Sequence, residues 1–271
     1  MKQLKNLALA AAIAAGALAP MIASAGYVNI GGLNMPTNGN FQVASVYENV
    51  ITGPGQTLSG YGEVTQINGQ AVSSLCSGCE LTYTFSYNVS SLTPASINFN
   101  GGLVKFYLGF GADNDFNPFL SANSAADLAA ATNGTLFMTG TGHAIDAFGN
   151  TFSGVGSNIG LPNAAGSGSG LLDILSTPGT GIAGANFDTN TLAANFGGFA
   201  DMQIGSSFSN VFQPHPSECV GLSVFTGASC LAGSADLRGY VIPEPGSLAL
   251  LGLGLAGLGA LQRRRQAKQP G

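Results

Sequence analysis

The chain has 271 residues, of which 41 are glycine and none is tryptophan, and hydrophobic residues make up 45% of it. Between residues 26 and 240, Lys105 and Arg238 are the only basic residues, against twelve acidic ones. A surface this acidic repels phosphate backbones, which excludes a nucleic-acid partner. The many glycines, with abundant Asn, Ser and Thr, favour short strands and turns over long helices.

The first 25 residues have the organisation of an export signal. Lys2 and Lys5 precede a short apolar core, and Ala23 and Ala25 form an A-x-A cleavage site. The core is too short for a comfortable membrane span, and small residues follow it. We therefore expect a signal helix that is cleaved, with the mature chain beginning at the next residue.

Alternation of apolar and polar residues predicts the strands. Residues 81–89 place five apolar side chains on one face and four polar ones on the other, which is typical of a strand with one face on a core. Asn68-Gly69 predicts a hairpin turn between residues 61–67 and 70–75. Residues 100–102, Asn-Gly-Gly, predict another turn. Further strands are expected at 42–51, 96–99, 103–110, 135–141, 200–204 and 235–241.

Two short helices are expected between these strands. Ser124, with Asp127 three residues later, resembles a capping box that starts a helix at 125–131. A second helix is predicted at 171–175. The Gly/Ser-rich residues 163–170 before it predict a flexible loop within one domain.

This pattern predicts an all-β body at residues 26–240, built as a single β-sandwich with two short helices. The strand spacing suits both a jelly-roll and an immunoglobulin-like arrangement. About 215 residues are enough for one domain with a real core.

Four cysteines, Cys76, Cys79, Cys219 and Cys230, occur in a chain with an export signal. An even number in an oxidising compartment predicts disulfides. Three pairings are possible, and we favour Cys76–Cys79 with Cys219–Cys230. A zinc site built from the first three cysteines and His215 is an alternative, although its spacing matches no standard zinc finger.

Residues 113–117, Asp-Asn-Asp-Phe-Asn, place oxygen ligands at alternate positions, as a calcium loop does. Pro118 stands where an EF-hand needs glycine, so a turn with local hydrogen bonds is preferred. Calcium held in another geometry is an alternative. We expect no resident metal and no cofactor.

Evidence for catalysis is sparse. His143 and Asp146 are the only His–Asp neighbours, and no G-x-S-x-G nucleophile elbow occurs. Two carboxylates that meet only in the fold would suit glycoside cleavage, but the sequence offers no preferred pair. We therefore expect no enzymatic activity, with a secreted hydrolase as an alternative.

The last thirty residues have three ordered parts. These are Pro243, Glu244 and Pro245; an uncharged apolar run that begins at Leu248 and ends at Leu261; and Arg263, Arg264 and Arg265. The two prolines hold the glutamate in an extended segment. The run is roughly 21 Å long as a helix, so flanking residues must help it to span a membrane. The arginines are a stop signal that places the extreme C-terminus in the cytoplasm.

This tail resembles the PEP-CTERM sorting signal of Gram-negative envelope proteins. The resemblance rests on the Pro-Glu-Pro residues, the apolar run and the arginines. It implies processing by an exosortase near the Pro-Glu-Pro segment, and delivery outward alongside exopolysaccharide.

These observations predict an exported envelope or matrix protein in three parts: signal 1–25, body 26–240 and sorting tail 241–271. The tail would anchor the chain by a C-terminal transmembrane helix with the body outside the cytoplasm, before delivery to the cell surface or matrix. The body is expected to be structural or adhesive. A carbohydrate-binding module for exopolysaccharide is the first alternative.

Overall fold

The computed structural model describes residues 26–161, 163–209 and 230–242. The strands are β1 Tyr27–Ile30, β2 Leu33–Pro36, β3 Asn38–Asn49, β4 Thr57–Ile67, β5 Gln70–Ala71, β6 Cys79–Thr93, β7 Ser96–Phe110, β8 Thr135–His143, β9 Asn150–Ser157, β10 Ala165–Ile174, β11 Leu192–Ala193, β12 Phe199–Ala200, β13 Met202–Ser209 and β14 Cys230–Tyr240. The helical elements are α2 Val72–Leu75, η1 Gly111–Asp113, α3 Ser124–Thr132 and α4 Gly184–Phe187. The predicted all-β class is confirmed.

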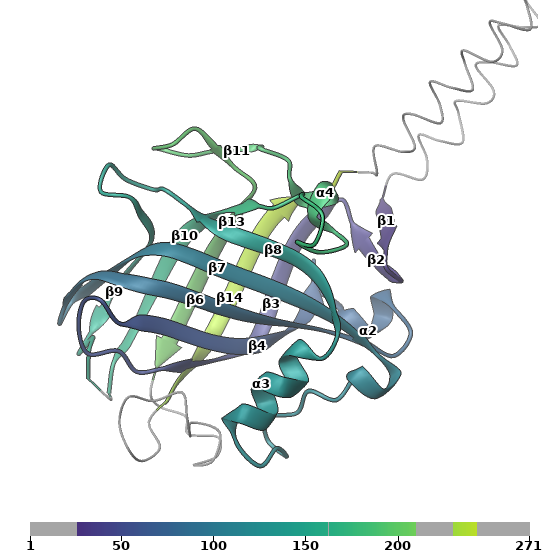
Figure 1. Ribbon diagram of the computed structural model, residues 1–271, viewed down its shortest axis with the longest axis horizontal. Coiled ribbons are helices and arrows are strands. Elements are labelled where there is room, and N and C mark those ends of the chain that lie inside the picture. The colour runs from purple at the N-terminus through teal and green to yellow at the C-terminus, as the bar shows by residue number, and fades with distance from the viewer. Residues whose placement is uncertain (1–25, 162, 210–229, 243–271) are drawn as a thin grey trace, which may run out of the picture.

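One large antiparallel sheet closes on itself (Figure 1). Its order is β13-β14-β3-β4-β6-β7-β8-β10, and β10 pairs in turn with β13. Strands β8 and β9 share one position, because each pairs with a different part of β7 and of β10. The ring therefore has eight positions, and successive strands around it are also successive along the chain. The predicted sandwich layers are the two facing halves of this sheet.

Strand β6 shows why the sequence folds in this way. The alternation at residues 81–89 turns Leu81, Tyr83, Tyr87 and Val89 inward, where all four are buried. The predicted turn at Asn68-Gly69 is also confirmed. Both residues have positive φ, 52° and 75°, as a two-residue hairpin requires, and they join β4 to β5.

The predicted turn at residues 100–102 is wrong, because these residues lie inside the continuous strand β7. Gly101 and Gly102 have positive φ, and the pairing of β7 with β6 and with β9 shifts register nearby. A Cβ atom on Gly102 would lie 2.5 Å from the ring of Tyr87. These glycines form an irregularity in the strand that leaves room for that ring.

The predicted loop at 163–170 and helix at 171–175 are also wrong, since strand β10 covers most of both segments. Two strand edges were available to this segment, and pairing with β8 and β9 on one side and β13 on the other overrides its local flexibility. Leu172 and Ile174 are buried on its inner face. Likewise, the strand expected at 70–75 is a two-residue strand followed by helix α2.

Helix α3 confirms the first predicted helix, but its cap is Asn123 instead of Ser124. The Asn123 side chain accepts a hydrogen bond from the amide of Ala126 at 3.0 Å. The helix lies against the outer face of β4 and β6. There the Tyr61 hydroxyl donates to Asp127 at 2.9 Å, and the Thr82 hydroxyl donates to the carbonyl of Ala131 at 2.7 Å.

One end of the ring, which we call the packed end, is filled by large side chains. Phe41 lies in ring contact with Phe106 at 5.9 Å and with Phe187 of α4 at 5.8 Å. These three side chains are fully buried. Asp201 fixes the covering segment, since it accepts from the amides of Ile174, Thr189 and Asn190, each at 2.6 Å.

Candidate functional site

The opposite end of the ring, which we call the open end, contains an internal pocket. It is lined by the end of β3, the starts of β4 and β7 and the inner faces of β6, β9, β13 and β14, between the two halves of the sheet. Its free volume is about 60 Å³, and its wall is almost entirely Val, Ile, Leu, Phe and Tyr side chains. An eight-position closed sheet encloses an interior that is either filled by side chains or holds one small ligand. Here the packed end is filled and the open end keeps space.

Glycines on the inner face of β9 and β10 create part of that space. A Cβ atom on Gly168 or Gly170 would lie 2.3 Å or 2.8 Å from the ring of Phe152. Gly154, which pairs with Gly168, lines the pocket directly. The Gly/Ser alternation that suggested a flexible loop is therefore a strand whose inner face is left bare.

Among the described residues that line the pocket, Glu48 is the only charged one, and it is only 6% exposed. It shares the inner face of β3 with Val46, and Val50 just after the strand lines the same pocket. Its strand partner Gly60 leaves space for the ring of Phe85, which a Cβ atom there would approach to 2.5 Å. Burial in this apolar wall raises the pKa of Glu48 to about 8. The carboxyl group therefore holds its proton at neutral pH.

Two tyrosines of β6 complete the polar part of the pocket. Tyr83 is 2% and Tyr87 is 4% exposed, and neither hydroxyl has a hydrogen-bond partner among the described residues. Burial raises the pKa of both hydroxyls, and a charge on Glu48 would raise that of Tyr83 further. The sequence analysis missed these three residues. The signal was the position of Glu48 two residues from each valine, on the apolar face of a predicted strand.

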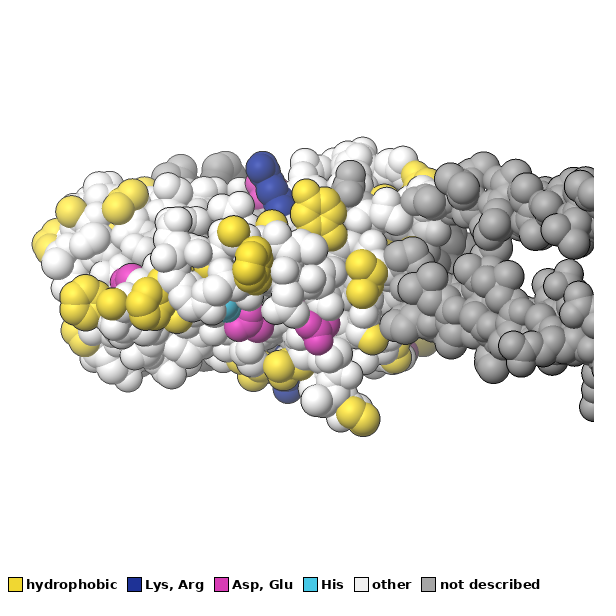
Figure 2. All heavy atoms as spheres, turned by 90° about the horizontal axis from the view of Figure 1, so that it is seen from above, with side chains coloured by type: hydrophobic (Ala, Val, Ile, Leu, Met, Phe, Trp, Pro, Cys, Tyr) yellow, Lys and Arg dark blue, Asp and Glu magenta, His cyan; other side chains and the backbone are white. Residues whose placement is uncertain are grey.

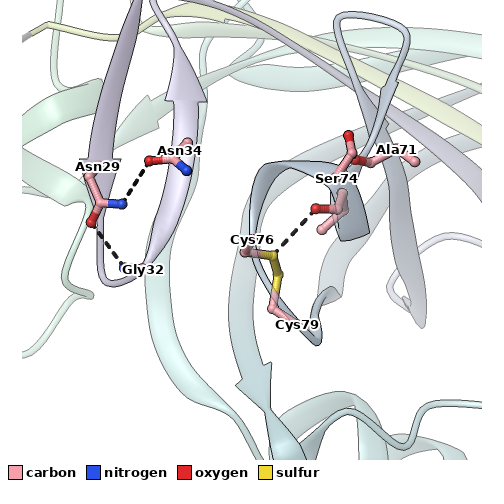
Figure 3. Close-up of a disulfide and its surroundings, with 8 residues drawn as sticks. Asn29, Gly32, Asn34, Ala71, Ser74, Cys76 and Cys79 are labelled. Atoms are coloured by element: carbon pink, nitrogen blue, oxygen red, sulfur yellow. Dashed lines mark hydrogen bonds between the residues drawn. A yellow bond between two sulfur atoms is a disulfide. The ribbon is translucent and has the colours of Figure 1, made fainter.

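The predicted Cys76–Cys79 disulfide is present, directly after helix α2 (Figure 3). It joins the end of α2 to the start of β6, beside the packed end, where both cysteines are buried. Both sulfurs are in this bond, so neither is a free thiolate for the alternative zinc site. Cys219 lies outside the described residues, so its predicted pairing with Cys230 stays a prediction.

The segment considered for calcium is held by protein contacts instead. Asp115 accepts a hydrogen bond from the side chain of Asn133 at 2.9 Å, and the amide of Phe116 donates to Glu80 at 2.9 Å. In the part of the chain that the structure describes, no three His, Cys, Asp or Glu side chains form a group able to hold a metal ion. The calcium alternative gains no support.

His143 pairs with an acidic residue that the sequence did not indicate. Its Nδ1 lies 2.8 Å from Asp173 on the neighbouring strand β10, and its Nε2 lies 3.2 Å from the carbonyl oxygen of Phe196. Asp146 instead accepts from the side chain and amide of Asn150, which lowers the pKa of Asp146. Both ring nitrogens of His143 are thus engaged, Nδ1 with the neighbouring strand and Nε2 with the segment near Phe196.

Two further carboxyl groups, Glu63 and Glu80, lie outside the ring. The pKa of Glu80 is raised to about 7, mainly because the carboxyl group is buried. The hydrogen bond from the amide of Phe116 lowers this pKa, and the nearby Glu63 raises it by a smaller amount. Neither residue lines the internal pocket.

The outer surface has few charges (Figure 2). On the face shown, hydrophobic side chains are spread among uncharged polar groups. A shallow groove of about 430 Å³ lies near the packed end and is lined by Asn40, Gln203, Arg238 and Tyr240, among others. It combines amide groups, one guanidinium and an exposed aromatic ring.

The sorting tail begins at the packed end of the body. The amide of Val241 donates to the carbonyl of Thr37 at 2.9 Å, and the amide of Ile242 donates to that of Asn186 in α4 at 2.9 Å. Residues 241–265 match the family model of the PEP-CTERM protein-sorting motif. The tail is a PEP-CTERM motif. No curated protein and no solved structure matches the chain.

The PEP-CTERM motif supports export and sorting by an exosortase, as the sequence predicted. The predicted cleavage site at Ala23 and Ala25 lies outside the described residues, as do the Pro-Glu-Pro segment and the apolar run with its arginines. Among the residues that the structure describes, no helix is both long and apolar enough to span a membrane.

Proposed function

We propose that this protein is a non-enzymatic binding protein of the cell envelope or extracellular matrix, and that its body holds a small apolar molecule inside the closed sheet. The observation that carries the proposal is the internal pocket at the open end, with its apolar wall and bare glycine face. Pockets of this kind, apolar with a few polar groups, are the usual sites of small-molecule binding.

The position of the tail supports this proposal. Strand β14 starts at the open end and finishes at the packed end, where the PEP-CTERM motif begins. If the tail anchors the protein during sorting, the packed end faces the membrane and the open end faces away from it. A pocket in that position faces the compartment outside the inner membrane while the chain is still attached.

Sorting is tested with a variant that has alanine at Pro243, Glu244 and Pro245. Intact mass and cell fraction are compared with those of the wild type in the native host. We expect the wild type to lose its tail and leave the inner membrane, while the variant keeps its tail and stays there. If both stay full length in the inner membrane, the tail acts only as an anchor and the exosortase proposal fails.

Occupancy of the pocket is tested with xenon, which binds dry apolar cavities. Ser206 points into the pocket, and its neighbour Ser207 is on the outer face of β13. For the full chain in lipid nanodiscs, we expect a protein-bound ¹²⁹Xe resonance that Ser206→Leu removes and Ser207→Leu retains. A resonance that is absent from the wild type, or unchanged by Ser206→Leu, would leave a structural or adhesive body as the better proposal.

A second candidate function is recognition of exopolysaccharide at the outer groove. Sugars require hydrogen-bonding and stacking groups. The groove offers both, through its side-chain amides, Arg238 and the exposed ring of Tyr240. The test is retention of the full chain on the host's own exopolysaccharide. Loss of retention on Arg238→Ala with Tyr240→Ala, and not on Ser207→Leu, would support this function, and no retention of the wild type would oppose it.

A further inference from the structure

The internal pocket contains more polar chemistry than an apolar ligand alone would need. The Tyr83 and Tyr87 hydroxyls are buried without a partner among the described residues, and the Glu48 carboxyl lines the same wall. Each buried hydroxyl that lacks a hydrogen bond destabilises the fold by about 1–3 kcal/mol. Two such hydroxyls, together with a buried carboxyl group on the same apolar wall, indicate a place where a ligand supplies a missing acceptor.

The charge of the wall restricts that ligand. No basic residue lines the described wall of the pocket, so a carboxylate or phosphate would enter there without a counter-charge. An ammonium group would need Glu48 to ionise, and two charges would then be desolvated together. Glu48 is neutral at pH 7 because its pKa is raised to about 8. An uncharged ligand therefore matches the pocket as it stands.

The donors in the wall and the size of the pocket narrow the chemical class of the ligand further. A protonated carboxyl group and two phenols offer three O–H donors. A carbonyl oxygen accepts such bonds and carries no hydrogen atom that would need an acceptor in the pocket wall. The free volume of about 60 Å³ admits the end of a narrow chain more easily than a bulky ring. The rest of the ligand would lie toward the exposed side of the pocket, against Leu58 and Leu161.

We infer that the pocket selects an uncharged, narrow apolar molecule with one carbonyl group near its end, whose oxygen accepts hydrogen bonds from Glu48 and from the neighbouring hydroxyl of Tyr83. This inference rests on the proposed function, because it requires that the pocket binds a ligand at all.

The inference predicts a pH dependence. The other titratable groups that line the described wall of the pocket with Glu48 are Tyr83 and Tyr87 of β6. Strands β4, β7, β9, β13 and β14 contribute apolar residues, glycine or serine to the described wall. When Glu48 loses its proton, the wall gains an uncompensated negative charge and loses one donor. Affinity for a carbonyl ligand should therefore fall as the pH rises above about 8, where Glu48 ionises.

The test compares three probes of equal chain length, 2-octanone, octylamine and octanoate, by saturation-transfer difference NMR. The full chain is held in lipid nanodiscs, and Ser206→Leu measures partition into the lipid. At pH 7 we expect 2-octanone to bind roughly tenfold more tightly than either charged probe. Glu48→Gln should keep this preference and lose the pH dependence, because the amide still donates. Glu48→Leu should remove the preference.

Three outcomes would overturn the inference. Tightest binding of octylamine, with affinity that rises toward pH 8, would identify a cation site. Tightest binding of octanoate would identify an anion site. Equal binding of all three probes, unaffected by Glu48→Leu, would show that the wall does not select a polar group. The xenon experiment separates these results from failure of the proposed function, since a bound resonance would persist in each.

Discussion

The two ends of the closed sheet are built from the same strands, yet one is a core and the other a pocket. At the packed end, inward positions hold large rings such as Phe41 and Phe106, and α4 adds Phe187 as a cover. At the open end, inward positions include Gly154 and Gly168. Side-chain volume at inward positions, with the strand pattern unchanged, decides which end is filled.

The largest expected effect is a loss of stability at the packed end. Phe41→Ala should lower the free energy of unfolding by about 3–5 kcal/mol, because it leaves a cavity among fully buried rings. The matched change at the open end, Phe152→Ala, should lower it by less than about 2 kcal/mol, since that ring is only half-buried beside existing space. Urea denaturation of both variants measures the difference. Equal losses would mean that the two ends are equally packed.

The next effect concerns the cover of the packed end. Asp201 accepts three backbone hydrogen bonds while 2% exposed, so Asp201→Ala leaves three amides without their partner. We expect a loss of about 3 kcal/mol. Hydrogen exchange should also show faster opening of the segment at Thr189 and Asn190. A matched change at exposed Asp236, Asp236→Ala, should leave both measurements near wild type.

The sequence predicted most of the strands and little of the site, for one physical reason. Alternation within one strand is local, so 81–89 was recognised from its own residues. The pocket depends on which strands face each other across the ring. Residues 163–170 resemble a loop until pairing with β9 places Phe152 over their bare inner face.

The same distinction explains the errors in detail. His143 was considered with Asp146, three residues away, but the ring brings Asp173 of β10 to it. The position of Glu48, two residues from Val46 and from Val50, is enough to predict an inward side chain. The two tyrosines on the same wall come from another strand, and no local pattern connects them with Glu48. The PEP-CTERM tail was recognised in full because its order of parts is linear, and no folding is needed to see it.

The smallest expected effect, taken over a single pH unit, is a pH dependence specific to the open end. Glu48 has a pKa of about 8 in the folded protein and 4.5 as its ordinary value. Between these values the folded protein holds a proton that the unfolded chain releases, so folding stability falls as the pH rises. The expected slope for one proton is about 1.4 kcal/mol per pH unit. The contribution is fully present below pH 4.5, is lost progressively up to about pH 8, and does not change further above it.

Glu48→Gln isolates this contribution, because the amide has nearly the same shape and does not titrate. Glu63 and Glu80 also have raised pKa values, so the wild-type curve alone would mix several groups. Subtracting the stability of the variant from that of the wild type at each pH cancels the contributions of Glu63 and Glu80. Urea denaturation at several pH values should give two curves that diverge from about pH 5 upward, with the variant becoming the more stable. Parallel curves would mean that Glu48 is solvated in the folded protein, and that the open end is a wet channel with no apolar pocket to hold a ligand.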